Sequence, residues 1–350
     1  MPLVIEPKET PAIWGGDALV RVYGKQADPT AKIGESWECW DENLVRNEPY
    51  AGASLAGLRA KLGTRLMGTL DSNRIFPVLT KIIDARQSLS VQVHPNDAYA
   101  QRVEGQPNGK TECWVILDAQ PGAELVLGWA KPTTREEYER RVKDGTLGDI
   151  LRRVPVKRND AFYLPSGTLH AIGAGIQLFE TQQASDLTYR IFDWNRVGAD
   201  GKPRQLHVER AADVLSYAQG KTAQTTHLRY RMGGMAVEAF IADPRFVVER
   251  VEVDSQSVLE PDEVPLIVMT MENEMSLECT AATIVLDRWT TALLPAAIGR
   301  VTLASKNGGA SAFLVTPSRE SWLGRTQRAD VSPAARERFL SQFEEVSANV

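Results

Sequence analysis

The stretch Ser88-Leu-Ser-Val-Gln-Val-His94 decides how this chain is expected to fold. Polar and apolar residues alternate in it, which predicts a β-strand with one apolar face and one polar face. The polar face would carry two hydroxyls, an amide and an imidazole, from Ser88, Ser90, Gln92 and His94. Pro95 cannot donate to a sheet ladder, so we expect the strand to end there and to leave His94 at an open rim. Such a row of polar groups indicates part of a functional site.

Short runs with strand character recur along the rest of the chain. In order, they are 35–40, 76–84, 112–117, 161–164, 246–253, 266–270 and 312–315. Many short strands with turns between them are typical of a β-sandwich or a β-barrel. We therefore expect a mainly β protein with few helices.

Helical patterns in the sequence are short, and two of them lie within the first half of the chain. Residues 54–67 carry leucines at helical spacing. A capping box at Thr134 and Glu137 opens a small helical insert near residues 133–152.

Two further helices are expected, at residues 208–218, closed by Gly220, and after Ser332-Pro333. The polar stretch 220–226 is expected to link residues 1–220 to a second β domain, residues 227–350, which ends in the last of these helices.

Composition narrows the class of protein and its partners. Of 350 residues, 43% are hydrophobic and 24% are charged, as in soluble globular proteins. The net charge of −5 and the lack of long basic runs argue against nucleic-acid or membrane partners. The sequence shows neither a signal-peptide pattern nor a membrane-spanning apolar run. Its three scattered cysteines favour a reducing cytoplasm over a disulfide framework.

The chain has only four histidines, so their placement is informative. His170 follows a predicted turn at residues 165–167, and Glu112 begins a strand of its own. Together with His94 they offer two imidazoles and one carboxylate, the ligand set of a catalytic zinc site. The same set also suits non-haem Fe(II). The alternative is that these histidines are ordinary barrel residues. His207 and His227 lie outside these motifs and are expected to be structural or exposed.

These motifs, taken together, resemble those of a known superfamily. Pro165-x-Gly167-x-x-His170 resembles the second motif of the cupin barrels, and Gln92-x-His94 followed by Glu112 resembles their first. Residues 89–97, 109–114 and 163–190 more closely resemble the type I mannose-6-phosphate isomerases in their shorter bacterial form. This resemblance implies two cupin-like (jelly-roll) β-barrel domains with short helical insertions, the second barrel being degenerate and metal-free.

The same resemblance implies one Zn²⁺ per chain, bound by Gln92, His94, Glu112 and His170. It also implies a substrate, mannose 6-phosphate or fructose 6-phosphate, whose interconversion moves a proton between C1 and C2 through an enediolate. Arg190 aligns with an arginine regarded as catalytic in the family. Because a guanidinium stays protonated, we assign Arg190 to transition-state electrostatics rather than to proton abstraction.

Glu180 and Lys110 are both candidates for the base, since burial near a metal shifts the pKa of either group. Each has a structural alternative, as a buried ion-pair partner or as a loop cap.

The resemblance places four residues at the substrate, namely Lys81, Ser90, Arg196 and Asp186. The alternatives are that Lys81 and Arg196 are solvated surface cations and that Arg190 forms a structural ion pair with Asp186 or Asp193.

Two other function classes compete with the isomerase. A cupin Fe(II) dioxygenase is disfavoured by the Gln92 ligand and by the basic residues, which suit a phosphate. A catalytically silent sugar-binding barrel is disfavoured by Arg190 and the full ligand set. The sequence leaves open the metal bound in the cell, the base, the strict sugar specificity, the pathway, and whether the protein is a monomer or a homodimer.

Overall fold

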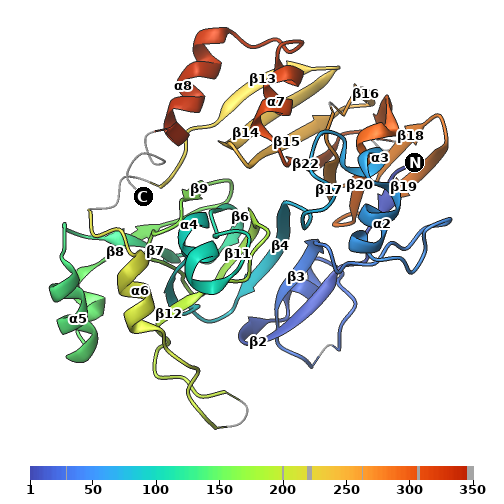
Figure 1. Cartoon of the computed structure of the whole chain (residues 1–350). Helices are drawn as coiled ribbons and strands as arrows, with labels where there is room; N and C mark the ends of the chain where they lie inside the picture. Colours follow the sequence, from blue (N-terminus) through green and yellow to red (C-terminus); the bar gives the residue numbers. More distant parts are fainter. Residues whose placement is uncertain (29, 199–200, 219–222, 262, 306–307, 345–350) are drawn as a thin grey trace.

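The computed structural model describes residues 1–28, 30–198, 201–218, 223–261, 263–305 and 308–344. Its strands form four antiparallel sheets in two groups, the first mostly blue to green and the second yellow to red in Figure 1. In these described ranges, no helix has both the length and the apolar composition that a membrane span requires.

The first group consists of a six-stranded sheet and a five-stranded sheet. The six-stranded order is β2 (Lys8–Gly16), β3 (Ile33–Cys39), β4 (Val78–Ala85), β11 (Ile176–Gln183), β6 (Glu112–Ala119) and β9 (Ala161–Leu164). The five-stranded order is β12 (Tyr189–Phe192), β5 (Val91–Val93), β10 (His170–Ile172), β7 (Glu124–Trp129) and β8 (Leu151–Pro155). Side chains from both sheets, such as Trp114 and Leu125, share one core, so the sheets face each other.

The second group has a seven-stranded sheet and a four-stranded sheet. The seven-stranded order is β1 (Leu3–Val4), β20 (Thr291–Leu294), β17 (Leu266–Glu272), β22 (Ala310–Thr316), β15 (Phe246–Val253), β14 (Met235–Asp243) and β13 (Leu228–Met232). The four-stranded order is β16 (Gln256–Leu259), β21 (Val301–Ala304), β18 (Met275–Cys279) and β19 (Ala282–Leu286). The chain thus begins in the sheet of its C-terminal half, because the buried residues Leu3 and Val4 pair with β20.

The six-stranded sheet lies between the five-stranded sheet and the second group of sheets. Ile83 of β4 belongs to the core of the first group, whereas its neighbour Ile82 packs with residues of the second group. The rings of Phe179 on β11 and Phe313 on β22 stack with centroids 4.4 Å apart. Every residue of β4 is buried because both faces of the sheet are covered.

Helices are short and lie outside the sheets. They are α1 (Ala18–Arg21), α2 (Leu55–Leu62), α3 (Thr64–Met67), α4 (Asp97–Tyr99), the π-helical η1 (Ala100–Glu104), α5 (Arg135–Lys143), the 3₁₀ turns η2 (Leu147–Ile150) and η3 (Ala296–Ile298), α6 (Val208–Val214), α7 (Arg319–Thr326) and α8 (Pro333–Glu344).

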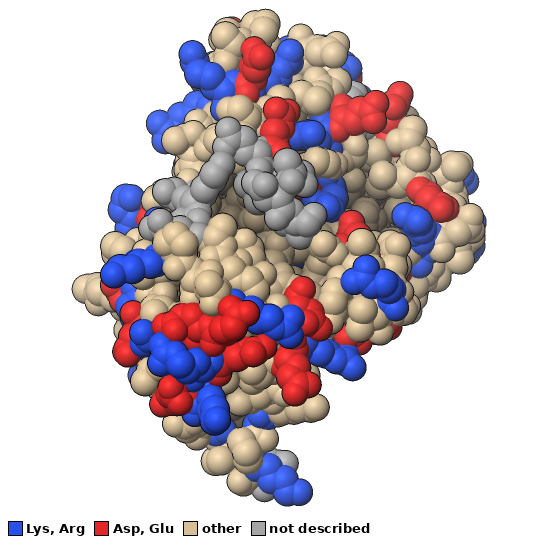
Figure 2. Space-filling model, turned by 60° about the vertical axis from the view of Figure 1, so that its left-hand side comes forward, with Lys and Arg blue, Asp and Glu red and all other residues tan. Residues whose placement is uncertain are grey.

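Helices α5 and α6 cover the outer face of the five-stranded sheet, where Tyr138 and Ala211 pack with Val91 and Val93. The exposed side of α5 carries charges of both signs, which Figure 2 shows intermingled on the lower part of the molecule. Arg140 and Arg141 both pair with Glu137 there, so this surface is not a basic patch.

The structure differs from the sequence expectations at several element ends. The helix expected over 54–67 is divided into α2 and α3 at Gly63, whose φ of +52° breaks helical geometry. The strand expected over 88–94 is shortened to β5, because the carbonyls of Ser88 and Leu89 accept side-chain hydrogen bonds rather than ladder bonds. Helix α6 ends at Val214, four residues earlier than expected. The proposed cap Gly220 and the first part of the 220–226 linker lie outside the described residues.

Candidate active site

The four expected ligands come from neighbouring positions in the first group of sheets. His170 at the start of β10 lies opposite Gln92 on β5, and Glu112 is the first residue of β6. His94 directly follows β5. The turn before His170 requires a positive φ at Gly167 (+84°), and the Gly167 N–H donates to the carbonyl of His94 at 2.9 Å. This bond ties the two histidine-bearing segments together.

The candidate ligating atoms of these side chains converge where the five-stranded and six-stranded sheets face each other. His170 Nε2 lies 3.1 Å from Glu112 Oε1, and His94 Nε2 lies 3.5 Å from Glu112 Oε2. Gln92 Nε2 lies 3.2 Å from His170 Nε2. The two histidines and Glu112 are buried, and one ligand atom from each lies within 4.8 Å of the others. The arrangement is compact enough for a single ion to contact all three.

Backbone carbonyls fix the tautomer of both imidazoles. His94 Nδ1 lies 2.7 Å from the carbonyl of Leu187, and His170 Nδ1 lies 2.9 Å from that of Thr168. A carbonyl oxygen only accepts, so each Nδ1 carries the proton and each Nε2 presents a lone pair toward Glu112. Metal-ligating histidines are commonly oriented in this way.

The electrostatics of the cluster favour the protonation states that metal binding requires. Burial and the nearby Lys110 ammonium hold the pKa of His94 well below its usual value. Burial alone would raise the pKa of Glu112, but Lys110 and the imidazoles outweigh it and hold that pKa well below its usual range. Neutral imidazole and ionised carboxylate are the forms that bind a divalent cation.

The donor set also leaves unused acceptors. Neither Glu112 carboxylate oxygen receives a hydrogen bond of good geometry from the described residues, although both are buried. A buried carboxylate without such bonds is costly, and a metal ion satisfies it directly. Two imidazole nitrogens and one carboxylate suit zinc or non-haem iron, so the residues His94, Glu112 and His170 fit a divalent metal.

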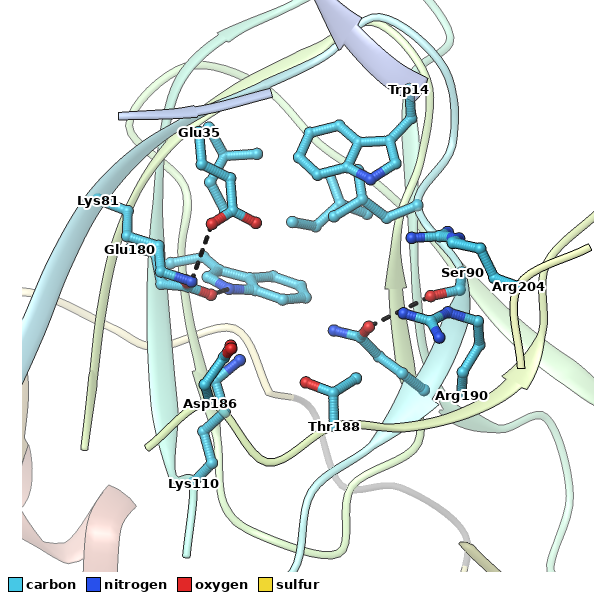
Figure 3. A pocket seen from close by; sticks show the side chains of 15 residues that line it. Trp14, Glu35, Lys81, Ser90, Lys110, Glu180, Asp186, Thr188, Arg190 and Arg204 are labelled. Atoms are coloured by element: carbon cyan, nitrogen blue, oxygen red, sulfur yellow. Dashed lines mark hydrogen bonds and ion pairs between the residues drawn. The ribbon is translucent and has the colours of Figure 1, made fainter. Parts of the chain in front are cut away.

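A pocket opens beside this cluster (Figure 3). Six of the seven residues predicted for catalysis or substrate binding line it, namely Lys81, Ser90, Lys110, Glu180, Asp186 and Arg190. Gln92 also lines it. Lys110 joins the pocket to the metal ligands, because its Nζ lies 3.1 Å from Glu112 Oε2 and 3.4 Å from His94 Nε2.

One side of the pocket holds a neutralised ion cluster. Lys81 Nζ lies 3.1 Å from Glu35 Oε2 and 3.4 Å from Glu180 Oε2. Burial lowers the pKa of Lys81, but the two carboxylates outweigh it and raise that pKa overall. Burial raises the pKa of Glu180, and Lys81 opposes this only in part. Glu180 also accepts a hydrogen bond from Trp114 Nε1 at 2.8 Å, which fixes its orientation.

The opposite side of the pocket is cationic. Arg190, Arg204 and Ser90 approach from that side in Figure 3. Arg190 forms no ion pair with any described carboxylate, and burial together with Arg204 lowers its pKa. Arg204 donates twice to Asp193, at 2.7 and 2.6 Å. This side therefore carries excess positive charge.

Arg196, expected at the substrate, does not line the pocket. It donates to Asp193 at 2.5 Å and to the carbonyl of Ser88 at 2.6 Å. Trp194 and Asn195 both adopt a positive φ, +56° and +54°, which reverses the chain after β12 and turns Arg196 back onto Asp193. Arg204 lines the pocket instead.

Sequence reasoning missed Arg204 and Glu35 as lining residues. Arg204 lies in a polar loop without periodicity, so no pattern in the sequence could have found it. Glu35 belongs to a strand that the sequence did predict. The alternation of Glu35, Ser36 and Trp37 could have indicated which side chains of that strand share a face with Glu35. Trp14, considered mainly a core residue, is both buried and part of the pocket wall.

Comparisons with known proteins agree with this geometry. Residues 3–128 match the family model of phosphomannose isomerase type I, catalytic domain. A mannose-6-phosphate isomerase of Streptococcus mutans is 39% identical over 256 residues, which cover 72% of this chain and 79% of that protein. Mannose-6-phosphate isomerase ManA of Bacillus subtilis is 44% identical over 230 residues, covering 65% of this chain and 71% of that one.

The fold agrees as well. The crystal structure of the mannose 6-phosphate isomerase from Bacillus subtilis superposes with a TM-score of 0.82 at 30% sequence identity, covering 90% of this chain and 99% of that one. The expectation of a mainly β, cupin-type architecture is thereby confirmed. Sequence and structure lead to the same conclusion: this chain belongs to the type I phosphomannose isomerase family.

Proposed function

We propose that the chain interconverts mannose 6-phosphate and fructose 6-phosphate by moving a proton between C1 and C2 of the sugar. The observation that carries this proposal is the position of the His94–Glu112–His170 cluster beside a pocket that holds both the buried carboxyl of Glu180 and Arg190, a cation without a carboxylate partner among the described residues. The names of the relatives support the same substrate pair. The test is conversion of fructose 6-phosphate by the purified protein before and after metal removal.

We assign one Zn²⁺ to Gln92, His94, Glu112 and His170. Bound there, it would act as a Lewis acid toward the sugar oxygens at C1 and C2. The neutral Gln92 and the single carboxylate would keep the formal charge of the site near +1, so that its electrophilicity is retained.

Glu180 is our assignment for the base. Its pKa is raised by burial, which brings a carboxyl closer to the range in which it exchanges protons with carbon acids near neutral pH. The hydrogen bond from Trp114 holds it in place. Lys110 forms an ion pair with Glu112 and lines the pocket, where its charge would stabilise the oxyanion of an enediolate.

Arg190 supplies a second positive charge for that oxyanion. It lies opposite Gln92 in the β12–β5 pairing, which puts it beside the row of metal ligands. Its guanidinium has no carboxylate partner among the described residues, so its charge remains available for the reaction. Because arginine does not release its proton near neutral pH, its role is electrostatic.

The phosphate belongs at the Arg204 and Ser90 side of the pocket. Lys81, expected to hold the phosphate, has both Glu35 and Glu180 as partners and is a poor anion receptor. Arg204 and Arg196 share the single carboxylate of Asp193, which leaves net positive charge beside the pocket. A phosphate dianion there would be held by charge-assisted hydrogen bonds. Asp186 then lies at the sugar rather than at the phosphate.

Neither competing function is favoured by a specific feature of the pocket. An Fe(II) dioxygenase has no need for the excess cations at Arg190 and Arg204, and a silent binding barrel has no need for a buried Glu180. We further propose a cytoplasmic location, because Cys39, Cys113 and Cys279 are all free thiols. The division at residues 220–227 into a catalytic barrel and a second, metal-free barrel remains our proposal for the domain organisation.

A further inference from the structure

His207, which sequence reasoning set aside, is bonded to Arg190 in two ways. The Arg190 N–H donates to His207 Nδ1 at 3.2 Å, and the His207 N–H donates to the Arg190 carbonyl at 2.7 Å. A third hydrogen bond runs from Arg190 Nη1 to the carbonyl of Gln205 at 3.1 Å. Residues 205–207 thus hold both the backbone and the guanidinium of Arg190.

The position of Arg190 in its sheet explains why these bonds matter. Strand β12 is the edge of the five-stranded sheet, so one side of its backbone has no neighbouring strand in the described part of the chain. The N–H and C=O of Arg190 point to that open side, since both bond to His207 rather than to β5. The β12–β5 register also shifts between Arg190 and Phe192, which weakens the ladder at this point. His207 completes the hydrogen bonding that the edge strand lacks.

The Arg190 side chain has few restraints of its own. Its Nε is buried without a hydrogen-bond partner among the described residues, and it forms no ion pair with a described carboxylate. Its direction therefore depends on its backbone position and on the single bond to Gln205, both of which are set by the 205–207 segment. We infer that His207 is a positioning residue for Arg190, which holds the guanidinium at the reacting end of the substrate. This inference rests on the proposed function.

The surroundings of His207 keep it in the form that can accept this bond. Burial and the charges of Arg190 and Arg210 lower the pKa of His207, while Glu104 opposes them. Glu104 is itself held by Arg210 and by the hydroxyl of Tyr189, whose ring centroid lies 6.1 Å from that of His207. A neutral imidazole with its proton on Nε2 leaves Nδ1 free to accept from Arg190. Protonation would place a second donor opposite the Arg190 N–H and break the bond.

Two substitutions separate positioning from general stability. His207→Asn retains a side-chain acceptor close to the position of Nδ1 but does not titrate, whereas His207→Ala removes the acceptor. In metal-loaded enzyme we expect His207→Ala to lower kcat about tenfold or more and to change KM by less than about threefold. The reason is that a displaced guanidinium stabilises the transition state less well, while substrate binding is nearly unaffected. His207→Asn should keep kcat within about threefold of the wild type.

The pH dependence gives a readout that a purely structural role would not move. The ratio of wild-type to His207→Asn kcat should be constant above about pH 6.5 and should fall as the pH is lowered below it, where His207 takes up its proton, with bound metal measured at every pH. A constant ratio, or a His207→Ala enzyme with wild-type kcat, would overturn the inference.

A measurement without substrate distinguishes a failure of this inference from a failure of the proposed function. Nitrogen NMR of the four imidazoles, assigned by substitution, should show His207 protonated on Nε2 only. Exchange of the Arg190 amide proton should be about tenfold or more faster in His207→Ala than in the wild type and nearly unchanged in His207→Asn. These results would stand even if the wild type proved inactive on mannose 6-phosphate. An Nδ1-protonated His207, or unchanged Arg190 exchange in His207→Ala, would refute the positioning role.

Discussion

Lys110 places its ammonium 3.1 Å from the carboxylate of Glu112, at the point where the pocket meets the candidate metal ligands. Both residues are buried, and the backbone around Lys110 is anchored by hydrogen bonds from the residues on either side of it. Gly109 donates to Asp97 Oδ1 at 2.8 Å, and Thr111 donates to Gln183 Oε1 at 2.9 Å. This contact lets the charge of the ligand cluster and the charge of the pocket influence each other directly.

The first prediction concerns the metal. His170→Ala should lose the bound metal and, with it, activity, because it removes one of two imidazole ligands and leaves Glu112 buried beside a cavity. Metal content by elemental analysis, measured alongside turnover, checks this. His227→Gln is the matched control, since His227 lies in the second group of sheets and contacts Glu238. A His170→Ala protein with one metal per chain would remove His170 from the ligand set.

The second prediction concerns Arg190. Arg190→Ala should keep the metal but lower kcat by a factor of about 10² to 10³, the usual effect of removing a donor to a developing oxyanion. Arg190→Lys should recover little, because the shorter ammonium does not reproduce the guanidinium geometry. Steady-state kinetics with metal analysis measures both. Full activity in Arg190→Ala would exclude it from the mechanism.

The third prediction separates two arginines that share one carboxylate. Arg204→Ala should raise KM for the sugar phosphate about tenfold or more, since it removes a charge-assisted contact to phosphate, and Arg196→Ala should raise it much less. Both variants disturb Asp193, so their comparison controls for that loss. Equal effects of the two substitutions would contradict the assignment of the phosphate to Arg204.

The fourth prediction concerns the base. Glu180→Gln keeps the shape of the side chain and an oxygen that accepts from Trp114, but it cannot take up a proton. Turnover should fall by a factor of about 10² to 10⁴, the range that general base catalysis contributes. Incorporation of solvent deuterium at C2 of fructose 6-phosphate-derived mannose 6-phosphate, followed by NMR, should slow in parallel. If deuterium still enters at the wild-type rate, Lys110 becomes the better candidate.

The fifth prediction concerns stability and pH, far from the pocket. Glu238 accepts from His227, Arg229 and Arg250, and these contacts lower its pKa to about 2. A carboxyl whose pKa is lower in the folded than in the unfolded state stabilises the fold above its unfolded pKa of about 4.5, and this contribution is lost as the pH falls toward 2.

Glu238→Gln should therefore lower the free energy of unfolding at neutral pH by at most about 3 kcal/mol, and the difference from the wild type should shrink below about pH 4.5. Urea unfolding at several pH values measures it. A difference that grows on acidification would contradict the assigned direction.

Sequence patterns predicted the strands well because side-chain alternation follows directly from strand geometry. Alternation alone predicted that Gln92 lies on one face of its strand and that Val91 and Val93 lie on the other, packed against a core, and both valines are buried in one. The resemblance to the isomerases brought together residues that lie far apart in the chain, such as His94 and His170, which alternation by itself could not pair.

What sequence could not predict depends on loop conformation and on contacts between distant segments. Arg204 lines the pocket in place of Arg196 because Trp194 and Asn195 both adopt a positive φ, which turns the chain back at this point. Neither residue type requires a positive φ, so the sequence does not predict this turn. The neutralisation of Lys81 follows from the pairing of three strands, which places Glu180 directly opposite it and Glu35 nearby.

The measurement that tests the account most directly is conversion of fructose 6-phosphate to mannose 6-phosphate by the purified protein, before chelation, after chelation, and after readdition of zinc. We expect activity that disappears on chelation and returns with about one zinc per chain. A protein that binds zinc stoichiometrically yet converts neither sugar phosphate would contradict it.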